Sequence, residues 1–127
     1  MKYYQIIVED SLGFQSISNI EVGDYDFELW GEYYSVLSTT GLNLWYNELT
    51  GEIPPEIGNL TNLTNLALYD NNISGEIPSE IWEMTNIIHL GLHYNELTGE
   101  IPPTIGNLTN LSSLFLHSNQ LSGEIPV

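Results

Sequence analysis

Residues 61–84 read TNLTNLALYDNNISGEIPSEIWEM, and residues 85–108 repeat the pattern in register as TNIIHLGLHYNELTGEIPPTIGNL. A copy with a degenerate start occupies residues 37–60 and a partial copy occupies 109–127, so the period is 24 residues. Every copy contains L-x-L-x-x-N-x-[LI]-[TS]-G-E-I-P. Such a period is typical of a solenoid, in which one repeat forms one turn and buries its apolar face only when neighbouring turns stack on it.

The spacing of leucines and prolines predicts how one turn is built. Each copy has two leucines separated by one residue, which predicts a short strand with both leucines facing the core. The pairs are Leu42/Leu44, Leu66/Leu68, Leu90/Leu92 and Leu114/Leu116. The segment after each G-E-I begins with proline and is too short for more than a 3₁₀ turn. Stacked turns should therefore form a parallel sheet over a continuous apolar core.

One asparagine follows each predicted strand, where the chain must turn away from the sheet. These residues are Asn47, Asn71, Asn95 and Asn119. A side-chain amide at this point can satisfy backbone groups of its own turn and of the adjacent one. We therefore expect the four asparagines to be structural.

The repeat resembles the leucine-rich repeat in its 24-residue plant-type variant, whose pattern is LxxLxxLxLxxNxLxGxIPxxLGxL. The resemblance covers residues 37–127 and implies an α/β leucine-rich-repeat solenoid. In that fold a β-rich right-handed superhelix carries a parallel concave sheet, 3₁₀ turns on the convex side and an N-terminal β cap. Plant receptor ectodomains and polygalacturonase-inhibiting proteins have a cysteine-paired cap, which is missing here. The stretch LWGEYYS (29–35) is instead similar to the lead-in of some bacterial and environmental secreted repeat proteins.

Residues 1–36 lack the repeat and form a second predicted unit. KYYQIIVE (2–9) and DYDFELW (24–30) alternate like strands, with breaks at Gly13 and Gly23. We expect a β-rich capping segment, because the first turn of a solenoid exposes its apolar cross-section. The acids at Asp24, Asp26 and Glu28 hint at calcium. However, Leu29 and Ser35 stand where an EF-hand loop needs glycine and glutamate, so an edge strand with Tyr25, Phe27 and Leu29 on its dry face is the simpler interpretation.

Composition limits the partners. The chain has 17 acidic side chains against one basic side chain, and its net charge is −16. Nucleic acids and anionic membranes are bound through lysine and arginine, so both are excluded as partners and a basic ligand is favoured. No stretch approaches the roughly 18 apolar residues of a membrane span, and residues 1–11 lack the composition of a signal peptide. With no cysteine in the chain, disulfides and thiolate metal sites are excluded too.

Aromatic side chains recur at positions that point away from the core, on the face this architecture commonly uses for partners. One column is Trp45, Tyr69, His93 and His117; beside it lie Tyr46, Asp70, Tyr94 and Ser118; the central column is Asn43, Ala67, Gly91 and Phe115. Tryptophan and tyrosine are enriched at binding hot spots. The predicted partner-binding residues are therefore Trp45, Tyr46, Tyr69, Asp70, His93, Tyr94, Phe115 and His117. The other interpretation is that cross-strand aromatic and histidine pairs merely stabilise the sheet.

Two groups of side chains raise the question of a metal. His93 and His117 on neighbouring strands could share one with Asp70 or His89, but two imidazoles without a fixed carboxylate or thiolate make a poor site. We therefore expect no metal there. Glu52, Glu76, Glu100 and Glu124 form a column of carboxylates, for which a solvated ladder is the default and calcium bridging is a hypothesis.

The sequence contains none of the motifs G-x-S-x-G, H-E-x-x-H, G-x-G-x-x-G or C-x-x-C, nor a Walker loop. We therefore expect no enzyme, no catalytic residues and no cofactor. The leading hypothesis is a non-enzymatic module that binds a protein or glycan on the concave face, and the resemblance implies that it is secreted or at the cell surface. The alternative is a self-assembling subunit of an extracellular filament or surface layer, built by head-to-tail stacking of solenoid ends, because GEIPV (123–127) carries no polar capping repeat.

Overall fold

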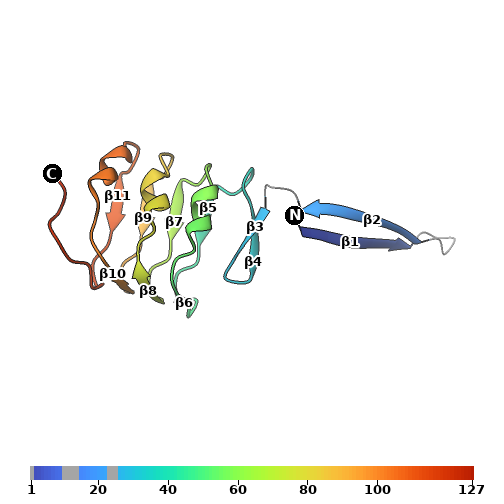
Figure 1. Ribbon diagram of the computed structural model, residues 1–127, viewed down its shortest axis with the longest axis horizontal. Coiled ribbons are helices and arrows are strands. Elements are labelled where there is room, and N and C mark those ends of the chain that lie inside the picture. The colour runs from blue at the N-terminus through green and yellow to red at the C-terminus, as the bar shows by residue number, and fades with distance from the viewer. Residues whose placement is uncertain (1, 10–14, 23–25) are drawn as a thin grey trace.

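The computed structural model describes residues 2–9, 15–22 and 26–127, and its repeats stack side by side as successive turns (Figure 1). One short strand from each turn joins a four-stranded parallel sheet, in the order β11-β9-β7-β5. The strands are β5 (Gly41–Asn43), β7 (Asn65–Ala67), β9 (His89–Gly91) and β11 (Ser113–Phe115). The first leucine of each pair lies opposite its equivalent in the neighbouring turn, as Leu42 does with Leu66. This sheet, called the main sheet below, confirms the predicted solenoid.

A second, smaller sheet follows the asparagines. It consists of β6 (Thr50–Gly51), β8 (Asn72–Glu76) and β10 (Glu96–Thr98), all parallel, in the order β10-β8-β6. A bridge between Glu100 and Ser122 extends the same pairing to the last turn. Each turn of the solenoid therefore contributes to two sheets.

The return segment of each turn is a 3₁₀ helix. The three are η1 (Pro55–Asn59), η2 (Ser79–Glu83) and η3 (Pro103–Asn107), and each follows a proline in the extended conformation. A fixed proline φ starts the turn, and the 3₁₀ helix takes the first five residues after Pro54, well before β7 begins at Asn65. All helices within the described ranges are of this 3₁₀ type, as predicted, so the helical part of the α/β class is 3₁₀ only.

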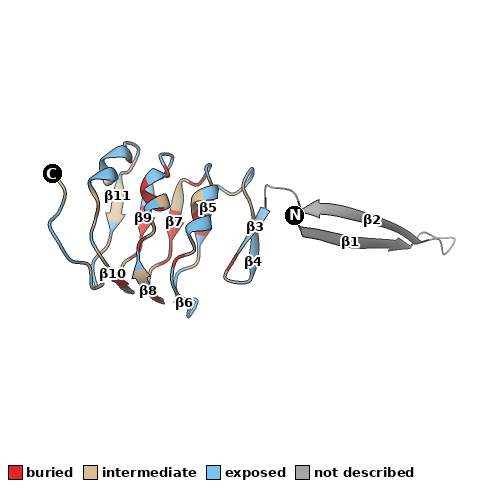
Figure 2. Ribbon diagram, viewed as in Figure 1, coloured by how far each residue is buried: buried red, intermediate tan, exposed pale blue. Residues whose placement is uncertain are grey.

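The core runs along the solenoid between the sheets and the 3₁₀ helices, and Figure 2 shows it as the red segments of the inner turns. Its central side chains have no solvent exposure, since each is covered by the turn on either side. They include Leu63, Leu66, Leu68, Ile73, Ile81, Ile87, Leu90, Leu92 and Leu97. They include both leucines of the predicted pairs Leu66/Leu68 and Leu90/Leu92, and they form the continuous apolar core that the repeat predicts.

Four strands precede the repeats. β1 (Lys2–Glu9) pairs antiparallel with β2 (Gln15–Val22), and β3 (Asp26–Leu29) pairs antiparallel with β4 (Glu32–Ser35). The sequence pattern missed β2 and β4. β3 ends one residue before the predicted strand does, because the chain turns sharply at Trp30 and Gly31, which both have positive φ.

The contacts of this segment with the repeats come from β3 and β4. Leu29 is only 1% exposed and joins the core, and Trp30 and Tyr34 pack against it, whereas Asp26 and Glu28 are exposed. Asp24 and Tyr25 lie outside the described residues. Figure 1 shows the β1–β2 hairpin on the far side of β3–β4 from the repeats. The division of the chain at residue 36 and the capping role stay predictions. Burial of Leu29 in the core of the repeats supports the capping role.

Within the described ranges no helix is long and apolar enough to cross a membrane.

Candidate functional site

Four rings stack along the main sheet, one from each turn. Trp45 and Tyr69 have centroids 5.7 Å apart and planes only 5° from parallel. Tyr69 stacks on His93 at 4.5 Å, and His93 stacks on His117 at 4.7 Å. Neighbouring strands are about 4.8 Å apart, which matches the distance at which flat rings stack. These four residues are called the aromatic ladder below.

Further aromatic side chains widen the ladder at its C-terminal half. Tyr94 meets His117 edge-on, with centroids 5.3 Å apart and planes at 82°, and Phe115 is tilted against His93 at 5.5 Å. Trp45, Tyr94 and Phe115 are about half exposed, and Tyr46 is 79% exposed. The ladder therefore stabilises the sheet by stacking and still presents a large aromatic surface to solvent.

The central column of the main sheet carries small residues at two positions. Ala67 and Gly91 are buried, although they point away from the core. A Cβ atom on Gly91 would lie 3.3 Å from Cδ1 of Tyr69, so the tyrosine ring rests on the glycine. The small residues let the rings of Tyr69 and His93 settle onto the sheet.

A hollow of about 400 Å³ lies on the same face of the main sheet. Its lining includes Asn65, Tyr69, His89, His93, Ser113 and Phe115. The polar groups of Asn65, His89 and Ser113 stand beside the aromatic rings. The hollow therefore combines aromatic and aliphatic lining with a few polar groups, a combination common in ligand-binding sites.

His93 sits in the middle of the ladder, and its Nδ1 atom is buried without a hydrogen-bond partner. Burial lowers the pKa of His93 below the ordinary imidazole value, and nearby His117 lowers it further, while Asp70 acts in the opposite direction. The neutral ring is therefore favoured. An unpaired buried nitrogen costs free energy, and this one lies over Gly91, against the sheet.

The residue after each ladder position has a left-handed backbone, which the sequence analysis missed. The φ angles of Tyr46, Asp70, Tyr94 and Ser118 all lie between 54° and 56°. Hydrogen bonds to the next turn hold this conformation: the Tyr46 N–H donates to the Tyr69 carbonyl at 3.1 Å, and that of Tyr94 donates to His117 at the same distance. Aspartate tolerates a positive φ, but tyrosine gives no such signal.

A smaller hollow lies next to this left-handed column. It measures about 290 Å³ and is lined by Tyr46, Asn47, Glu48, Asp70 and Asn72. Two of the predicted partner-binding residues, Tyr46 and Asp70, therefore line one recess, while the other six belong to the ladder and its neighbours. The structure thus brings the predicted residues together on one face; that they bind a partner stays a prediction.

The asparagines that follow the strands connect successive turns. Asn71 is 9% exposed; its Oδ1 accepts hydrogen bonds from the N–H groups of Asn47 and Leu49, at 2.9 and 3.0 Å. Its Nδ2 donates to the carbonyls of Leu44 and Leu68, both at 2.9 Å. Asn95 and Asn119 repeat most of these contacts one and two turns later, but each Oδ1 accepts a single backbone N–H, that of Ile73 or of Leu97. One amide thus satisfies backbone groups in two turns.

The carboxylates of the glutamate column lie over glycines of the next turn. A Cβ atom on Gly75 would come within 2.8 Å of Glu52 Cγ, and one on Gly99 within 2.9 Å of Glu76 Cγ. No three histidine, aspartate or glutamate side chains within the described ranges are arranged to hold a metal ion. His93 and His117 meet face to face, so they do not aim their nitrogens at a common point. Calcium bridging between neighbours of the glutamate column stays a hypothesis.

The comparison with protein families identifies the repeat. The Leucine Rich Repeat model matches residues 38–60, 62–84, 86–108 and 110–127, within one residue of the boundaries predicted from the sequence. No match was found among curated proteins.

Solved structures of plant proteins resemble the chain. The plant peptide hormone receptor RGFR1, in complex with RGF2, is 40% identical with a TM-score of 0.71 over 94% of this chain and 18% of the receptor. The BIR2 ectodomain from Arabidopsis thaliana is 36% identical with a TM-score of 0.66, over 68% of this chain and 46% of the ectodomain. A plant ice-binding protein is 39% identical with a TM-score of 0.63, over 68% of this chain and 28% of that protein.

This chain therefore spans less than half the length of each of these proteins. The similarity of residues 29–35 to bacterial repeat proteins stays a prediction. The four matched repeats cover most of the chain, and their strands, asparagines and 3₁₀ turns have the expected geometry. The chain belongs to the leucine-rich repeat family and has plant-type repeats.

Proposed function

We propose that the protein is a non-enzymatic binding module that takes a protein or peptide ligand on its main sheet. The aromatic ladder carries this proposal. Trp45 is 50% exposed at one end of a continuous stack, on a face where packing of the core gives no reason for a tryptophan. Large, rigid aromatic side chains supply contact area at low entropic cost, which is why they dominate binding hot spots.

The proposed contact surface comprises the ladder and the side chains beside it. Its residues are Trp45, Tyr46, Tyr69, Asp70, His93, Tyr94, Phe115 and His117. The hollow over Ala67 and Gly91 would receive a side chain of the ligand. Because the rings are already stacked, the surface is preorganised and loses little freedom on binding.

The solved structures support a protein ligand. One of them is described as a peptide hormone receptor in complex with RGF2, and another as an ectodomain. Since the chain spans only part of each, we extend peptide binding and an extracellular location to it as parts of the proposal. A glycan is the alternative ligand class, because exposed tryptophan and tyrosine rings also stack on sugars.

The charge of the chain favours a basic ligand. With 17 acidic side chains against one basic side chain, the field around the protein attracts cations over a distance set by the salt concentration. We expect the association rate to fall as salt is added, while the dissociation rate changes little.

A selection from a displayed peptide library tests the proposal. Peptides enriched on the wild-type protein should fail to bind the Trp45→Ala/Tyr69→Ala variant, whose folding is checked by circular dichroism. Tyr33→Ala is the matched control, because Tyr33 is also an exposed aromatic residue but lies on β4, outside the main sheet. Peptides that bind the double variant as well as the wild type would place the site elsewhere. If the protein bound a glycan array but selected no peptides, the ligand would be a sugar and not a peptide.

Head-to-tail self-assembly stays a prediction. It requires the mass measured by light scattering to grow with protein concentration, whereas a monomeric binding module keeps a constant mass. Substitutions in the aromatic ladder should not affect such growth, because assembly would use the solenoid ends.

A further inference from the structure

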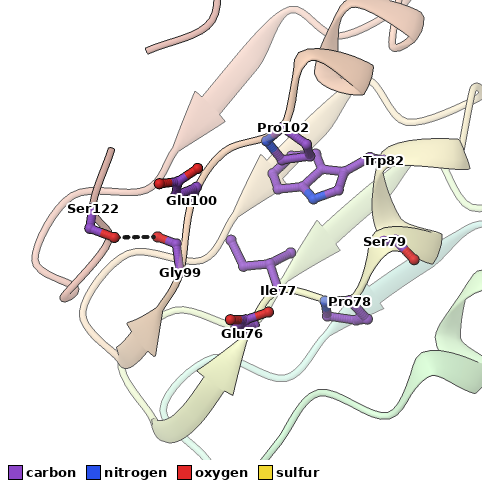
Figure 3. Close-up of a pocket in the computed structure, with 9 residues that line it drawn as sticks. All are labelled: Glu76, Ile77, Pro78, Ser79, Trp82, Gly99, Glu100, Pro102 and Ser122. Atoms are coloured by element: carbon purple, nitrogen blue, oxygen red, sulfur yellow. Dashed lines mark hydrogen bonds between the residues drawn. The ribbon is translucent and has the colours of Figure 1, made fainter. Parts of the chain in front are cut away.

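A second recess lies away from the main sheet, where the second sheet meets the 3₁₀ helices. It has a volume of about 690 Å³, and Figure 3 shows the side chains around it. Turns two, three and four contribute the lining, which is Glu76, Ile77, Pro78, Ser79, Trp82, Gly99, Glu100, Pro102 and Ser122. None of these residues belongs to the proposed contact surface on the main sheet.

Trp82 departs from the repeat at this point. The equivalent positions of the neighbouring turns are Gly58 and Gly106. A Cβ atom on Gly106 would meet nothing within 4 Å, whereas one on Gly58 would lie 2.7 Å from Cβ of Glu80, so the two glycine positions differ in the space they leave. Trp82 is 1% exposed, and Figure 3 shows its indole reaching from η2 among the lining side chains.

The indole nitrogen of Trp82 makes no hydrogen bond with any described residue. Figure 3 shows it on the edge of the ring nearest Ile77, inside the circle of lining residues. A tryptophan N–H is only a donor. It is not among the fully buried unpaired atoms of the described residues, so it stays within reach of a ligand. The recess therefore offers one directed donor, for which the ligand must bring an acceptor.

Two carboxylates complete the recess. Glu76 and Glu100 are exposed, and they come from successive turns, whose strands are about 4.8 Å apart. The only basic side chain of the chain is Lys2, so nothing in the repeats neutralises them. Ile77, Pro78 and Pro102 supply apolar parts of the lining.

We propose that this recess, called the Trp82 recess below, binds an arginine or lysine side chain of a basic peptide segment. The cationic head lies between the carboxylates of Glu76 and Glu100, the methylene stem packs on Ile77 and Pro102, and a carbonyl of the peptide accepts the Trp82 N–H. Arginine fits best, because its planar fork can bond to both carboxylates at once.

Titration followed by NMR tests the proposal. A blocked Gly-Arg-Gly tripeptide, added at about 150 mM salt to screen long-range attraction, should shift the indole N–H resonance of Trp82 but not that of Trp45. A blocked Gly-Gln-Gly tripeptide should not. The Glu76→Gln/Glu100→Gln variant should bind the arginine peptide about fivefold more weakly, since each exposed ion pair contributes under about 1 kcal/mol.

Glu52→Gln is the matched control, because Glu52 belongs to the same column but does not line the recess. It should leave the affinity unchanged. If Glu52→Gln weakened binding as much as the double variant does, the attraction would come from diffuse charge and the proposal would be overturned. The proposal would also be overturned if the arginine peptide left the Trp82 resonance unmoved. The same holds if the glutamine peptide, or methyl glucoside added as a sugar probe, shifted that resonance equally. The Trp45→Ala/Tyr69→Ala variant should give the full Trp82 shift, so failure of the main-sheet proposal leaves this one standing.

Discussion

The rings of Tyr69 and His93 stack with their centroids 4.5 Å apart and their planes 16° from parallel, and both rings lie against Gly91. Tyr69 also stacks on Trp45, so it has an aromatic partner on each side. The interior members of the ladder therefore belong both to the binding surface and to the structure of the sheet. Unfolding experiments report on the structural role of these residues, and ligand titrations report on their role in binding.

The first prediction concerns the stability of the ladder. Tyr69→Ala should lower the free energy of unfolding by roughly 1–2 kcal/mol, because two stacking contacts are lost. Trp45→Ala should cost less, since Trp45 is half exposed and has one stacking partner in the ladder. Urea denaturation measures both. An equal loss for the two variants would contradict the stacking explanation.

The second prediction concerns the asparagines. Asn71→Ala should destabilise the protein by about 2–4 kcal/mol, because it leaves buried N–H and carbonyl groups of two turns without partners. Asn47 is the matched control: it is exposed, and its side chain bonds only to the carbonyl of Trp45 among the described residues. Asn47→Ala should therefore cost under about 1 kcal/mol. The melting temperature of Asn71→Ala should therefore lie below that of Asn47→Ala, and the reverse order would contradict the prediction.

The third prediction separates two requirements for glycine. Gly51 and Gly75 have almost the same φ, 78° and 79°, but a Cβ atom meets Glu52 only at Gly75. Gly51→Ala should cost about 1 kcal/mol for the left-handed backbone, and Gly75→Ala should cost more.

A double-mutant cycle supplies the control for this pair. Adding Glu52→Ala to Gly75→Ala should bring the cost back to that of Gly51→Ala, because it removes the side chain that the new Cβ would displace. Simple additivity of the two changes would refute the contact.

The fourth prediction is a pH dependence of stability. Burial and His117 lower the pKa of His93 in the folded protein, so below about pH 6.5 the unfolded chain binds more protons at this residue than the folded chain does. Its contribution to stability is therefore present at neutral pH and is lost as the pH falls through that range. His93→Gln should show a smaller loss of melting temperature between about pH 7.5 and 5.5 than the wild type. If the melting temperatures of the wild type and of His93→Gln fell equally with pH, the prediction would be wrong.

Most of the solenoid follows from the sequence because its positions repeat. Leu66, Leu90 and their equivalents mark the strands, and Pro54, Pro78 and Pro102 mark where the 3₁₀ helices begin. Repetition averages out the ambiguity of any single short apolar run. Residues 1–36 have no such support, and the strands β2 and β4 were missed there.

The parts of the candidate site that were missed depend on single residues. The left-handed backbone at Tyr46 and Tyr94 is imposed by bonds to the next turn and contradicts the preference of tyrosine. Burial of Gly91 depends on how the ring of Tyr69 lies. Trp82 did carry a signal, because it replaces a glycine of both neighbouring turns, but its burial and its free N–H are visible only in three dimensions.

The contact between each glutamate and the glycine of the next turn determines how such a protein can change length in evolution. Glu52 pairs with Gly75, Glu76 with Gly99 and Glu100 with Gly123, always at the same separation along the chain. Inserting or deleting a few residues between the partners would misalign one pair and the asparagine bonds with it. Duplicating or losing a whole 24-residue unit keeps every remaining pair matched. The ladder and its binding face can therefore lengthen or shorten in steps of one ring without any redesign of the turns.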